Sequence, residues 1–230
     1  MCDTGTRPDM RAILEDMPWF RRLPETRQSR IAGEAYETRH DRHEYVAHVG
    51  DPSSSWIGVA SGLLKLTGVH RNGQSLMLTM VPPGSWVGEG SVMKNEVRRY
   101  DVVAITPSRV VHLPGPTFRW LLHTDFDFAQ FMLEHLNERL GQYIRMVESD
   151  RLTDPVARLA RAISSLFNPV LYPKTAATLQ FSQVEFGELA GLSRQSINTA
   201  IKELERRGMV RAEYGALVVL DLKGLQELDG

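Results

Sequence analysis

The sequence has a single cysteine, Cys2, in 230 residues. One thiol excludes an intramolecular disulfide, a cysteine-ligated iron–sulfur cluster and a structural zinc site built from cysteines. The chain also lacks an uninterrupted apolar run of the ~18 residues that a membrane-spanning helix needs, and its first residues lack the apolar core of a signal peptide. We therefore expect a cytoplasmic protein without membrane contact.

An excess of charge of one sign is missing too. The 27 Lys and Arg residues stand against 28 Asp and Glu residues, which gives a net charge of −1. No basic excess points to nucleic acid, so any such site has to come from a local motif. The 18 glycines and 12 prolines follow no period. With 42% apolar residues, the composition is typical of a folded chain of one or two domains.

The first half of the chain alternates short β-like segments with turn residues. Asn72 and Gly73 lie between two apolar segments, and both residue types tolerate the positive φ of a tight hairpin turn. Many short strands at regular spacing predict a small barrel or sandwich. The expected strands cover residues 44–49, 56–60, 63–67, 75–80, 102–105 and 109–113, and two helical patterns precede them at residues 10–17 and 24–35.

From residue 126 the apolar period lengthens to that of a helix. Five apolar residues recur at intervals of three or four, namely Met132, Leu136, Leu140, Tyr143 and Val147. This face could pack against the helix's own domain or pair with a second chain as a coiled coil. We favour pairing in a homodimer, because a helix of about 25 residues is long for a domain of this size.

A new helix begins directly after the long one. Asp154 is a plausible N-cap, and Pro155 suits the first helical position because its missing N–H needs no partner there. We place a domain boundary at this junction, over residues 147–154, and expect it to act as a hinge. The expected division is a β domain at 1–125, a long helix at 126–152 and a C-terminal domain at 153–230.

The most informative segment is SQVEFGELAGLSRQSINTAIKELERRG, at residues 182–208. Ser182 and Glu185 form a capping box for a first helix. Gly191 ends that helix, and Ser193 caps a second one. Two helices joined by a short glycine-containing turn are a helix-turn-helix. The alternative is an ordinary helical hairpin with a solvated polar face.

A hairpin turning at Tyr214 and Gly215 follows and would complete a winged helix. In such a unit the start of the second helix meets base edges in the major groove. The candidate contact residues are Ser193, Arg194, Gln195, Ser196, Asn198, Thr199 and Lys202. Arginine pairs with guanine, and Gln or Asn pairs with adenine, whereas Lys202 and the Ser193 end are better placed for phosphates. The motif predicts binding to double-stranded DNA.

Two parts of the sequence resemble the Crp/Fnr family of bacterial transcription regulators, and the resemblance covers nearly the whole chain. Residues 191–210, GLSRQSINTAIKELERRGMV, are similar to that family's recognition helix. Residues 50–51, GVASGLLKLTGVHRNGQSLMLTMVPPGSWVGEG at 58–90 and RRYDVVAITPSRVVHLP at 98–114 are similar to its cyclic nucleotide-binding β-roll.

The resemblance implies an α+β fold. Its parts are an N-terminal β-roll (jelly roll) with flanking helices, a long dimerisation helix and a C-terminal winged helix-turn-helix. It also implies a homodimeric transcription regulator with a palindromic DNA site, gated by a small-molecule effector, with RNA polymerase as a partner.

The resemblance places the effector site in the β-roll. Its candidate residues are Gly88, Glu89, Gly90, Ser91, Arg98, Arg99, Tyr100 and Tyr143. Members that bind cAMP have Arg-Ser-Ala at the phosphate and Thr-Ser at the adenine, but this chain has Arg-Arg-Tyr at 98–100 and Tyr-Ile at 143–144. Asp101 follows and would oppose an anion if it faced inward. The changes argue against cAMP and leave two alternatives, a small anionic effector or a constitutive regulator with a vestigial pocket.

The recognition helix departs from the family pattern as well. Members of the family that this chain resembles commonly have Arg-Glu at the start of this helix and a second Arg four residues after the Glu. Together these residues read a TGTGA half-site. This chain has Arg194, Gln195 and Thr199 at those places. We therefore expect a different half-site within an inverted repeat.

The sequence contains no pattern that indicates metal binding or catalysis. His43 and His48 would face opposite sides of a strand, and His135 next to the apolar face is a candidate for sensing pH or binding a metal. No nucleophile with a base, phosphate-binding loop or metal-ligand cluster occurs. We expect no enzymatic activity, no metal and no tightly bound cofactor.

Overall fold

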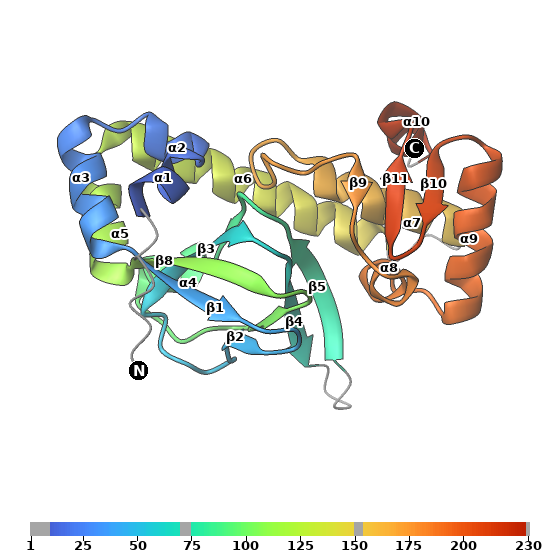
Figure 1. The fold of residues 1–230 in the computed structure, drawn as a ribbon, viewed down its shortest axis with the longest axis horizontal. Coiled ribbons are helices and arrows are strands. Elements are labelled where there is room, and N and C mark those ends of the chain that lie inside the picture. The colour runs from blue at the N-terminus through green and yellow to red at the C-terminus, as the bar shows by residue number, and fades with distance from the viewer. Residues whose placement is uncertain (1–9, 70–74, 150–153, 229–230) are drawn as a thin grey trace, which may run out of the picture. The chain divides into compact units, whose positions relative to one another are not determined.

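The computed structural model describes residues 10–69, 75–149 and 154–228, and Figure 1 shows its ribbon. The chain forms two compact units, one of Met1–Gly68 with Val81–His135 and the other of Val69–Met80 with Leu136–Gly230. This division differs from the boundaries expected at residues 125 and 152. The start of the long helix packs in the first unit, and a segment from the β-rich half packs in the second.

The first unit contains two antiparallel sheets. One has the strand order β1-β8-β3-β6, and within this unit the other has the order β2-β7-β4. The strands are β1 (Tyr36–His40), β2 (Tyr45–Ala47), β3 (Ser55–Ser61), β4 (Leu64–Val69), β6 (Trp86–Val87), β7 (Asp101–Ala104) and β8 (Ser108–Pro114). β3 and β8 are buried on both faces, so each has an apolar run rather than a clean alternation.

Short helices and the start of the long helix surround the aromatic core of this unit. They are α1 (Met10–Glu15), α2 (Pro18–Arg21), α3 (Glu25–Glu34), α4 (Glu89–Lys94) and α5 (Gly115–Thr124); α1, α2, α3 and α5 lie at the same end of the first sheet (Figure 1). Trp56 lies 5.4 Å from Trp19 and 4.4 Å from Trp86, ring centre to ring centre. A Cβ on Gly58 would come within 2.6 Å of the Trp86 ring, so only glycine fits beneath it.

The predicted long helix is α6 (Phe126–Ser149), with 24 residues. Asp125 caps its start, because Phe128 N–H donates to Asp125 Oδ1 at 2.8 Å. Part of the predicted hinge at 147–154 lies outside the described residues, as does the predicted Asn72-Gly73 turn.

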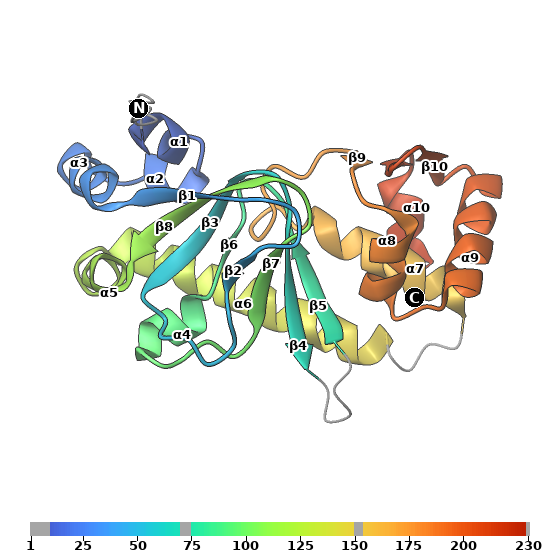
Figure 2. The same cartoon turned by 60° about the horizontal axis from the view of Figure 1, so that its bottom comes forward.

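The second unit contains the predicted winged helix (Figure 2). Its elements are α7 (Pro155–Ser164), the 3-10 turn η1 (Ser165–Phe167), β9 (Thr178–Leu179), α8 (Gln183–Ala190), α9 (Arg194–Arg206), β10 (Val210–Glu213), β11 (Ala216–Val219) and α10 (Leu222–Glu227). The sheet order is β10-β11-β9. β5 (Ser75–Val81) belongs to this unit as far as Met80. The predicted N-cap of α7 is confirmed, since Val156 N–H donates to Asp154 Oδ1 at 2.9 Å.

Candidate nucleic-acid interface and ligand site

The predicted helix-turn-helix is present as α8 and α9. At the start of α8, Glu185 N–H donates to Ser182 Oγ at 3.3 Å and Ser182 N–H donates to the Glu185 carboxylate at 2.6 Å, so both halves of the capping box form. α8 ends at Gly191, whose φ of 61° favours glycine. At the start of α9, Ser196 N–H donates to Ser193 Oγ at 3.1 Å. Local capping therefore fixes both helix starts and the turn between them.

Arg158 on α7 forms hydrogen bonds with this turn. Its Nη2 donates to the carbonyls of Ala190 and Gly191, at 2.9 and 3.1 Å. These carbonyls lie at the end of α8, where the helix dipole leaves negative partial charge. A Cβ on residue 191 would come within 2.6 Å of Arg158 Nη2. The arginine and the glycine together set the direction in which α9 leaves the turn.

α9 has one buried and one exposed face, as the sequence predicts. The buried side chains are at most 3% exposed and are Ile197, Ala200, Ile201 and Leu204. Among the candidate contact residues, Ser193, Arg194, Gln195, Thr199 and Lys202 are exposed, and Ser196 and Asn198 are half-buried. The Ser193 and Ser196 hydroxyls lie 2.8 Å apart, and Thr199 Oγ1 donates to the Gln195 carbonyl at 3.2 Å. The helix thus brings the predicted residues together on one accessible side.

Ion pairs neutralise the two arginines at the C-terminal end of α9, so the positive charges of this helix that are unpaired in the described part of the chain lie nearer its start. Arg206 and Arg207 both bind Glu203, at 2.8 and 2.7 Å. These hydrogen bonds lower the pKa of Glu203 to about 2. Arg194 and Lys202 form no ion pair with any described residue. They are therefore the side chains of α9 best able to neutralise DNA phosphates or meet base edges.

Arg98 is a buried guanidinium in the first unit. It is 4% exposed, and its Nη2 donates to the Ser55 carbonyl at 2.8 Å. A Cβ on residue 88 would lie 2.6 Å from Arg98 Nη1, so Gly88, with a φ of 90°, allows the arginine to lie against the start of α4. Burial lowers the pKa of Arg98, although an arginine remains charged at neutral pH.

The charge of Arg98 has no carboxylate hydrogen-bonded to it in the described part of the chain. Its Nη1 forms no hydrogen bond there, and the carboxylate of Asp51 acts on it only through longer-range electrostatic attraction. Buried charges in proteins normally have a bonded counter-charge. An anionic ligand beside Nη1 would supply one.

Four other effector candidates of the first unit are Glu89, Gly90 and Ser91 in the first turn of α4, and Tyr100. Glu89 is 5% exposed, and its Oε1 lies 3.7 Å from Nε2 of His135 on α6. Ser91 is buried and Gly90 is exposed. Tyr100 is half-buried. Glu89 and Ser91 are the members of this group whose burial matches that of Arg98.

One further candidate, Arg99, is placed differently from the expectation, and the place of Tyr143 in the effector site stays a prediction. The side chain of Arg99 is 68% exposed and donates to Glu96 at 2.8 Å, so we leave Arg99 out of the proposed anion site. Tyr143 belongs to the second unit. Asp101, which could have opposed an anion, accepts a hydrogen bond from Val49 N–H at 2.8 Å.

The exposed apolar stripe of α6 begins one residue away from the expected one. Met132 is 1% exposed and packs in the core of the first unit. It therefore cannot face a second chain, and we correct this part of the prediction. Three side chains at intervals of seven are 61%, 58% and 59% exposed, namely Leu133, Leu140 and Val147. Leu136 and Tyr143, also from the predicted face, are half-buried.

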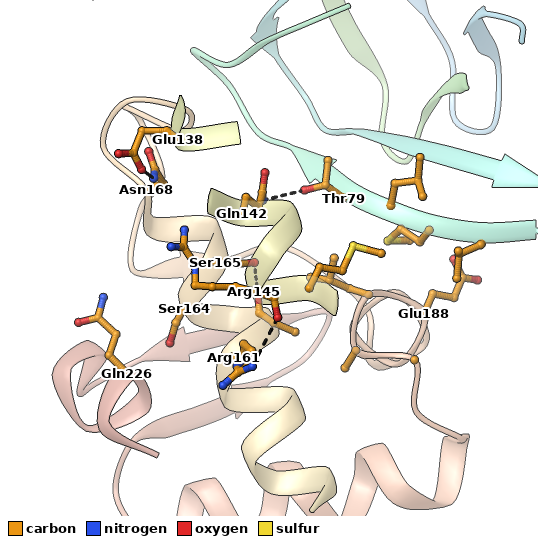
Figure 3. Close-up of a pocket in the computed structure, with 18 residues that line it drawn as sticks. Thr79, Glu138, Gln142, Arg145, Arg161, Ser164, Ser165, Asn168, Glu188 and Gln226 are labelled. Carbon is orange, nitrogen blue, oxygen red and sulfur yellow. Dashed lines mark hydrogen bonds between the residues drawn. The ribbon is translucent and has the colours of Figure 1, made fainter. Parts of the chain in front are cut away.

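The second unit contains a pocket of about 440 Å³ (Figure 3). β5, α6, α7 and α8 contribute to its walls, with charges of both signs from Glu138, Arg145, Arg161 and Glu188. Thr79 and Gln142 line it and join a buried network. Gln142 Nε2 donates to Thr79 Oγ1 at 3.3 Å and to Tyr172 Oη at 2.7 Å. The Tyr172 hydroxyl also lies 2.9 Å from Thr79 Oγ1 and accepts from Arg139 at 3.2 Å.

Tyr172→Phe is expected to lower the free energy of unfolding by about 1–3 kcal/mol, because it leaves buried polar groups of the network without this hydroxyl while keeping the ring. Urea unfolding measures the change. Tyr214→Phe is the matched control, since Tyr214 is fully exposed at 107%, and its effect should stay within about 0.5 kcal/mol. Equal effects of the two substitutions would contradict this role of Tyr172.

The sequence gives no clear signal for two residues, the half-buried Arg158 and the buried His112. Arg158 contacts carbonyls 32 and 33 residues away, and no local pattern signals such a contact. His112 follows two valines in β8. A histidine inside an apolar strand is a signal for a hydrogen-bonded core position, although its partners cannot be read from the strand itself.

Two features are absent from the described residues. No group of three or more His, Cys, Asp or Glu side chains there is arranged to hold a metal ion. In the same part of the chain, no helix has the length and apolar character to cross a bilayer. His135 is 1% exposed and lies 6.2 Å from the Trp56 ring, centre to centre.

Two family models match the chain. The cyclic nucleotide-binding domain matches residues 37–125, and the Crp-like helix-turn-helix domain matches residues 157–228. The chain is 30% identical over 182 residues to the transcriptional regulator SdrP of Thermus thermophilus, covering 78% of this chain and 86% of that protein. It is 22% identical over 185 residues to the cAMP-activated global transcriptional regulator CRP of Haemophilus influenzae, covering 77% and 83%.

Solved structures of similar fold also cover most of the chain. FixK2 from Bradyrhizobium japonicum has a TM-score of 0.70 at 17% identity, covering 85% of this chain and 98% of that one. A Crp/Fnr-family regulator from Thermus thermophilus has a TM-score of 0.60 at 28% identity, covering 84% and 97%. These likenesses confirm the predicted α+β fold with its long helix and C-terminal helix-turn-helix.

Proposed function

The chain belongs to the Crp/Fnr family of transcription regulators, and on this premise we propose that it binds an inverted-repeat DNA site as a homodimer under the control of a small anionic effector. It is a DNA-binding regulator with a cyclic nucleotide-binding domain and a Crp-like helix-turn-helix. The dimer, the inverted repeat and the effector are the proposed parts.

The exposed stripe of α6 supports the homodimer. Leu133, Leu140 and Val147 are spaced by one heptad, which is the spacing of the seam in a two-chain coiled coil. Two copies related by a two-fold axis would present two α9 helices to the DNA. A two-fold dimer reads an inverted repeat whose half-sites lie about one helical turn apart.

One observation carries the effector proposal, namely the buried Arg98 guanidinium without a bonded carboxylate. Its Nη1 lies at the start of α4 against Gly88, in the segment that the cyclic nucleotide-binding family model covers. A guanidinium binds phosphate and carboxylate groups through two parallel hydrogen bonds. The Arg-Arg-Tyr run at 98–100 differs from that of cAMP-binding members, so we propose an anion other than cAMP.

Arg98→Ala is expected to weaken effector binding by about tenfold or more, the cost of losing a hydrogen bond to a charged group. Calorimetric titration with cAMP, cGMP, cyclic di-GMP and small organic acids identifies the ligand and measures this loss. Arg99→Ala is the matched control, because Arg99 is exposed and bonded to Glu96, and it should bind like the unmodified protein. Equal binding by Arg98→Ala would remove Arg98 from the site.

The alternative is a constitutive regulator with a vestigial pocket. The short distance between Glu89 and His135 favours this alternative. The Glu89 carboxylate, an effector candidate, already has His135 of its own unit as a neighbour, so it does not need a ligand as its partner. A ligand at 100 times its Kd adds about 2.7 kcal/mol to stability, so a thermal-shift screen detects one readily. Tight DNA binding that no stabilising compound changes would support the alternative.

Three further proposals follow from the family. RNA polymerase is the proposed protein partner, the cytoplasm is the proposed location, and the protein is proposed to have no enzymatic activity. The similar proteins SdrP and CRP reported above are named as transcriptional regulators.

A further inference from the structure

A line of polar side chains crosses the first sheet from its edge to Arg98. It runs through the neighbouring strands β1, β8 and β3 (Figure 1). Thr38 and His40 on β1, His112 on β8 and Ser55 on β3 share one face, because alternate residues of a strand point the same way and the register aligns the three strands.

Hydrogen-bond distances connect these side chains without a break. Thr38 Oγ1 lies 2.8 Å from both His40 Nε2 and His112 Nε2. His112 Nδ1 lies 3.0 Å from Ser55 Oγ. The Ser55 carbonyl accepts from Arg98 Nη2 at 2.8 Å. The four residues His40, Thr38, His112 and Ser55 are named the polar relay.

The two histidines of the polar relay differ in burial. His112 is 7% exposed, and burial, helped by the nearby charges of His40 and Arg98, lowers its pKa to about 4. His112 is therefore neutral at physiological pH. Burial also lowers the pKa of His40, whereas Glu44, 4.0 Å away, raises it. His40 is only half-buried, so on acidification it takes up a proton before His112 does.

Few other charged groups face the polar relay. The Tyr36 ring stacks on His112 at 4.8 Å, centre to centre. The Asp51 carboxylate attracts Arg98, and the Tyr100 hydroxyl, which is neutral over this pH range, is the other titratable group near that arginine. The remaining charged residues of β1 and β8 alternate with the relay residues and so lie on the opposite face. They bind one another there, and are Glu37, Arg39 and Arg109.

The single hydroxyl hydrogen of Thr38 makes the polar relay directional. A neutral imidazole has one donor and one acceptor nitrogen, so when Thr38 uses its hydrogen within the polar relay it donates to one histidine and accepts from the other. In one direction His40 donates to Thr38, Thr38 to His112, and His112 to Ser55 Oγ, which leaves the Ser55 hydrogen available. In the reverse direction Ser55 donates to His112, and its oxygen can only accept further bonds.

We propose that His112 is a positioning residue of the effector site, which determines through Ser55 whether the anion held by Arg98 meets a second hydrogen-bond donor. This inference rests on the effector site proposed above. Protonated His40 must donate from Nε2, so it selects the direction that leaves the Ser55 hydroxyl as a donor. The favoured ligand is an anion with a second oxygen beside the one bound by Arg98, and its affinity rises as His40 gains a proton.

The first test needs no ligand. In histidine labelled with ¹⁵N, long-range proton–nitrogen spectra show which ring nitrogen carries the proton. We expect His112 to stay neutral from pH 8 to pH 5 while its tautomer changes in step with the titration of His40. Thr38→Val should abolish that change of tautomer. The control is His43→Gln, which replaces an exposed histidine three residues from His40 and should preserve the change. A His112 tautomer that ignores His40, or follows it in Thr38→Val, would overturn the polar relay.

The second test uses inorganic sulfate, whose charge does not change over this pH range. We expect sulfate to bind about tenfold more tightly below the pH at which His40 titrates than above it, the effect of one hydrogen bond to a charged group. Thr38→Val and His112→Phe should remove this dependence, while Arg98→Ala should remove binding at both pH values. Binding that needs Arg98 but ignores His112 would overturn this inference and leave the proposed function intact. Binding that ignores Arg98 would overturn the proposed anion site itself.

Discussion

Leu140→Glu is expected to convert the proposed dimer to a monomer and to weaken its binding to an inverted-repeat site by at least about 100-fold. Leu140 lies in the middle of the exposed stripe of α6, at 58% exposure, between Leu133 and Val147. Equivalent seam positions of a parallel coiled coil face each other, so the change would bury two like charges without counter-charges. A monomer also loses the second half-site contact, which linkage makes worth about 10²–10⁴-fold.

Sedimentation equilibrium and a DNA titration measure these two losses. Because Leu140 is exposed in the single chain, the variant should keep its fold, which circular dichroism checks. Glu134→Lys is the matched control, since it also changes charge at an exposed position of α6, about 120° around the helix from Leu140. The control should remain a dimer. A folded, dimeric Leu140→Glu protein would show that this stripe is not the interface.

The stripe also shows where the sequence alone was insufficient. Met132 and Leu133 are adjacent in a helix, and a repeat of three and four residues is compatible with either as its first member. Only the aromatic core of the first unit decides between them, because it takes up Met132 and leaves Leu133 outside. That core is built from residues far apart in the sequence, so no local pattern contains the answer.

The helix-turn-helix was predictable because its determinants are local. The capping box of Ser182 and Glu185, the left-handed Gly191 and the cap at Ser193 all act within three residues. The buried face of α9 likewise follows from its own period. Arg158 was not predictable, because it reaches the turn from another helix.

The strand β1 was missed for a different reason. Its sequence YETRH contains no aliphatic residue, so the alternation that identifies a half-buried strand is absent. Thr38 and His40 face the same side as His112, and they form hydrogen bonds through the Thr38 hydroxyl instead of supplying apolar surface. A buried polar network therefore replaced the hydrophobic signal that strand prediction relies on.

Arg194→Ala is expected to reduce discrimination at one base pair of each half-site by about 1–3 kcal/mol, the value of a bidentate arginine–guanine contact. Arg194 is the first residue of α9 and is exposed. It forms no ion pair with any described residue, so its guanidinium is available to a base edge. Arg206→Ala is the matched control on the same helix, because Arg206 is bound to Glu203, and it should leave the base preference unchanged.

Two neighbours of Arg194 are expected to change the half-site itself. Gln195 is exposed, and its amide both donates and accepts, which suits adenine. Thr199 Oγ1 donates to the Gln195 carbonyl, so its methyl group is the part left to face outward, and that group suits a thymine methyl. Neither residue can reproduce the acidic acceptor and second arginine that accompany a TGTGA half-site.

Lys202 is expected to act on all sequences alike. It is exposed, lies two turns beyond Arg194 and forms no ion pair with any described residue. Lys202→Ala should therefore weaken binding to every site by a similar factor and reduce the salt dependence by about one unit of slope, as expected for one lost phosphate contact. Arg194→Ala differs because the affinity that it loses depends on which base lies opposite residue 194.

Selection of binding sites from random DNA, carried out with the unmodified protein and the two variants, separates these roles. The expected result is an inverted repeat with a guanine that disappears from the consensus in Arg194→Ala and persists in Lys202→Ala. Adenine opposite Gln195 and thymine opposite Thr199 should accompany it. An unaltered TGTGA repeat would show that the residues at the start of α9 do not contact the bases assigned to them here. Because both variants keep Ser193 and the buried face of α9, a changed consensus reports base contacts rather than a displaced helix.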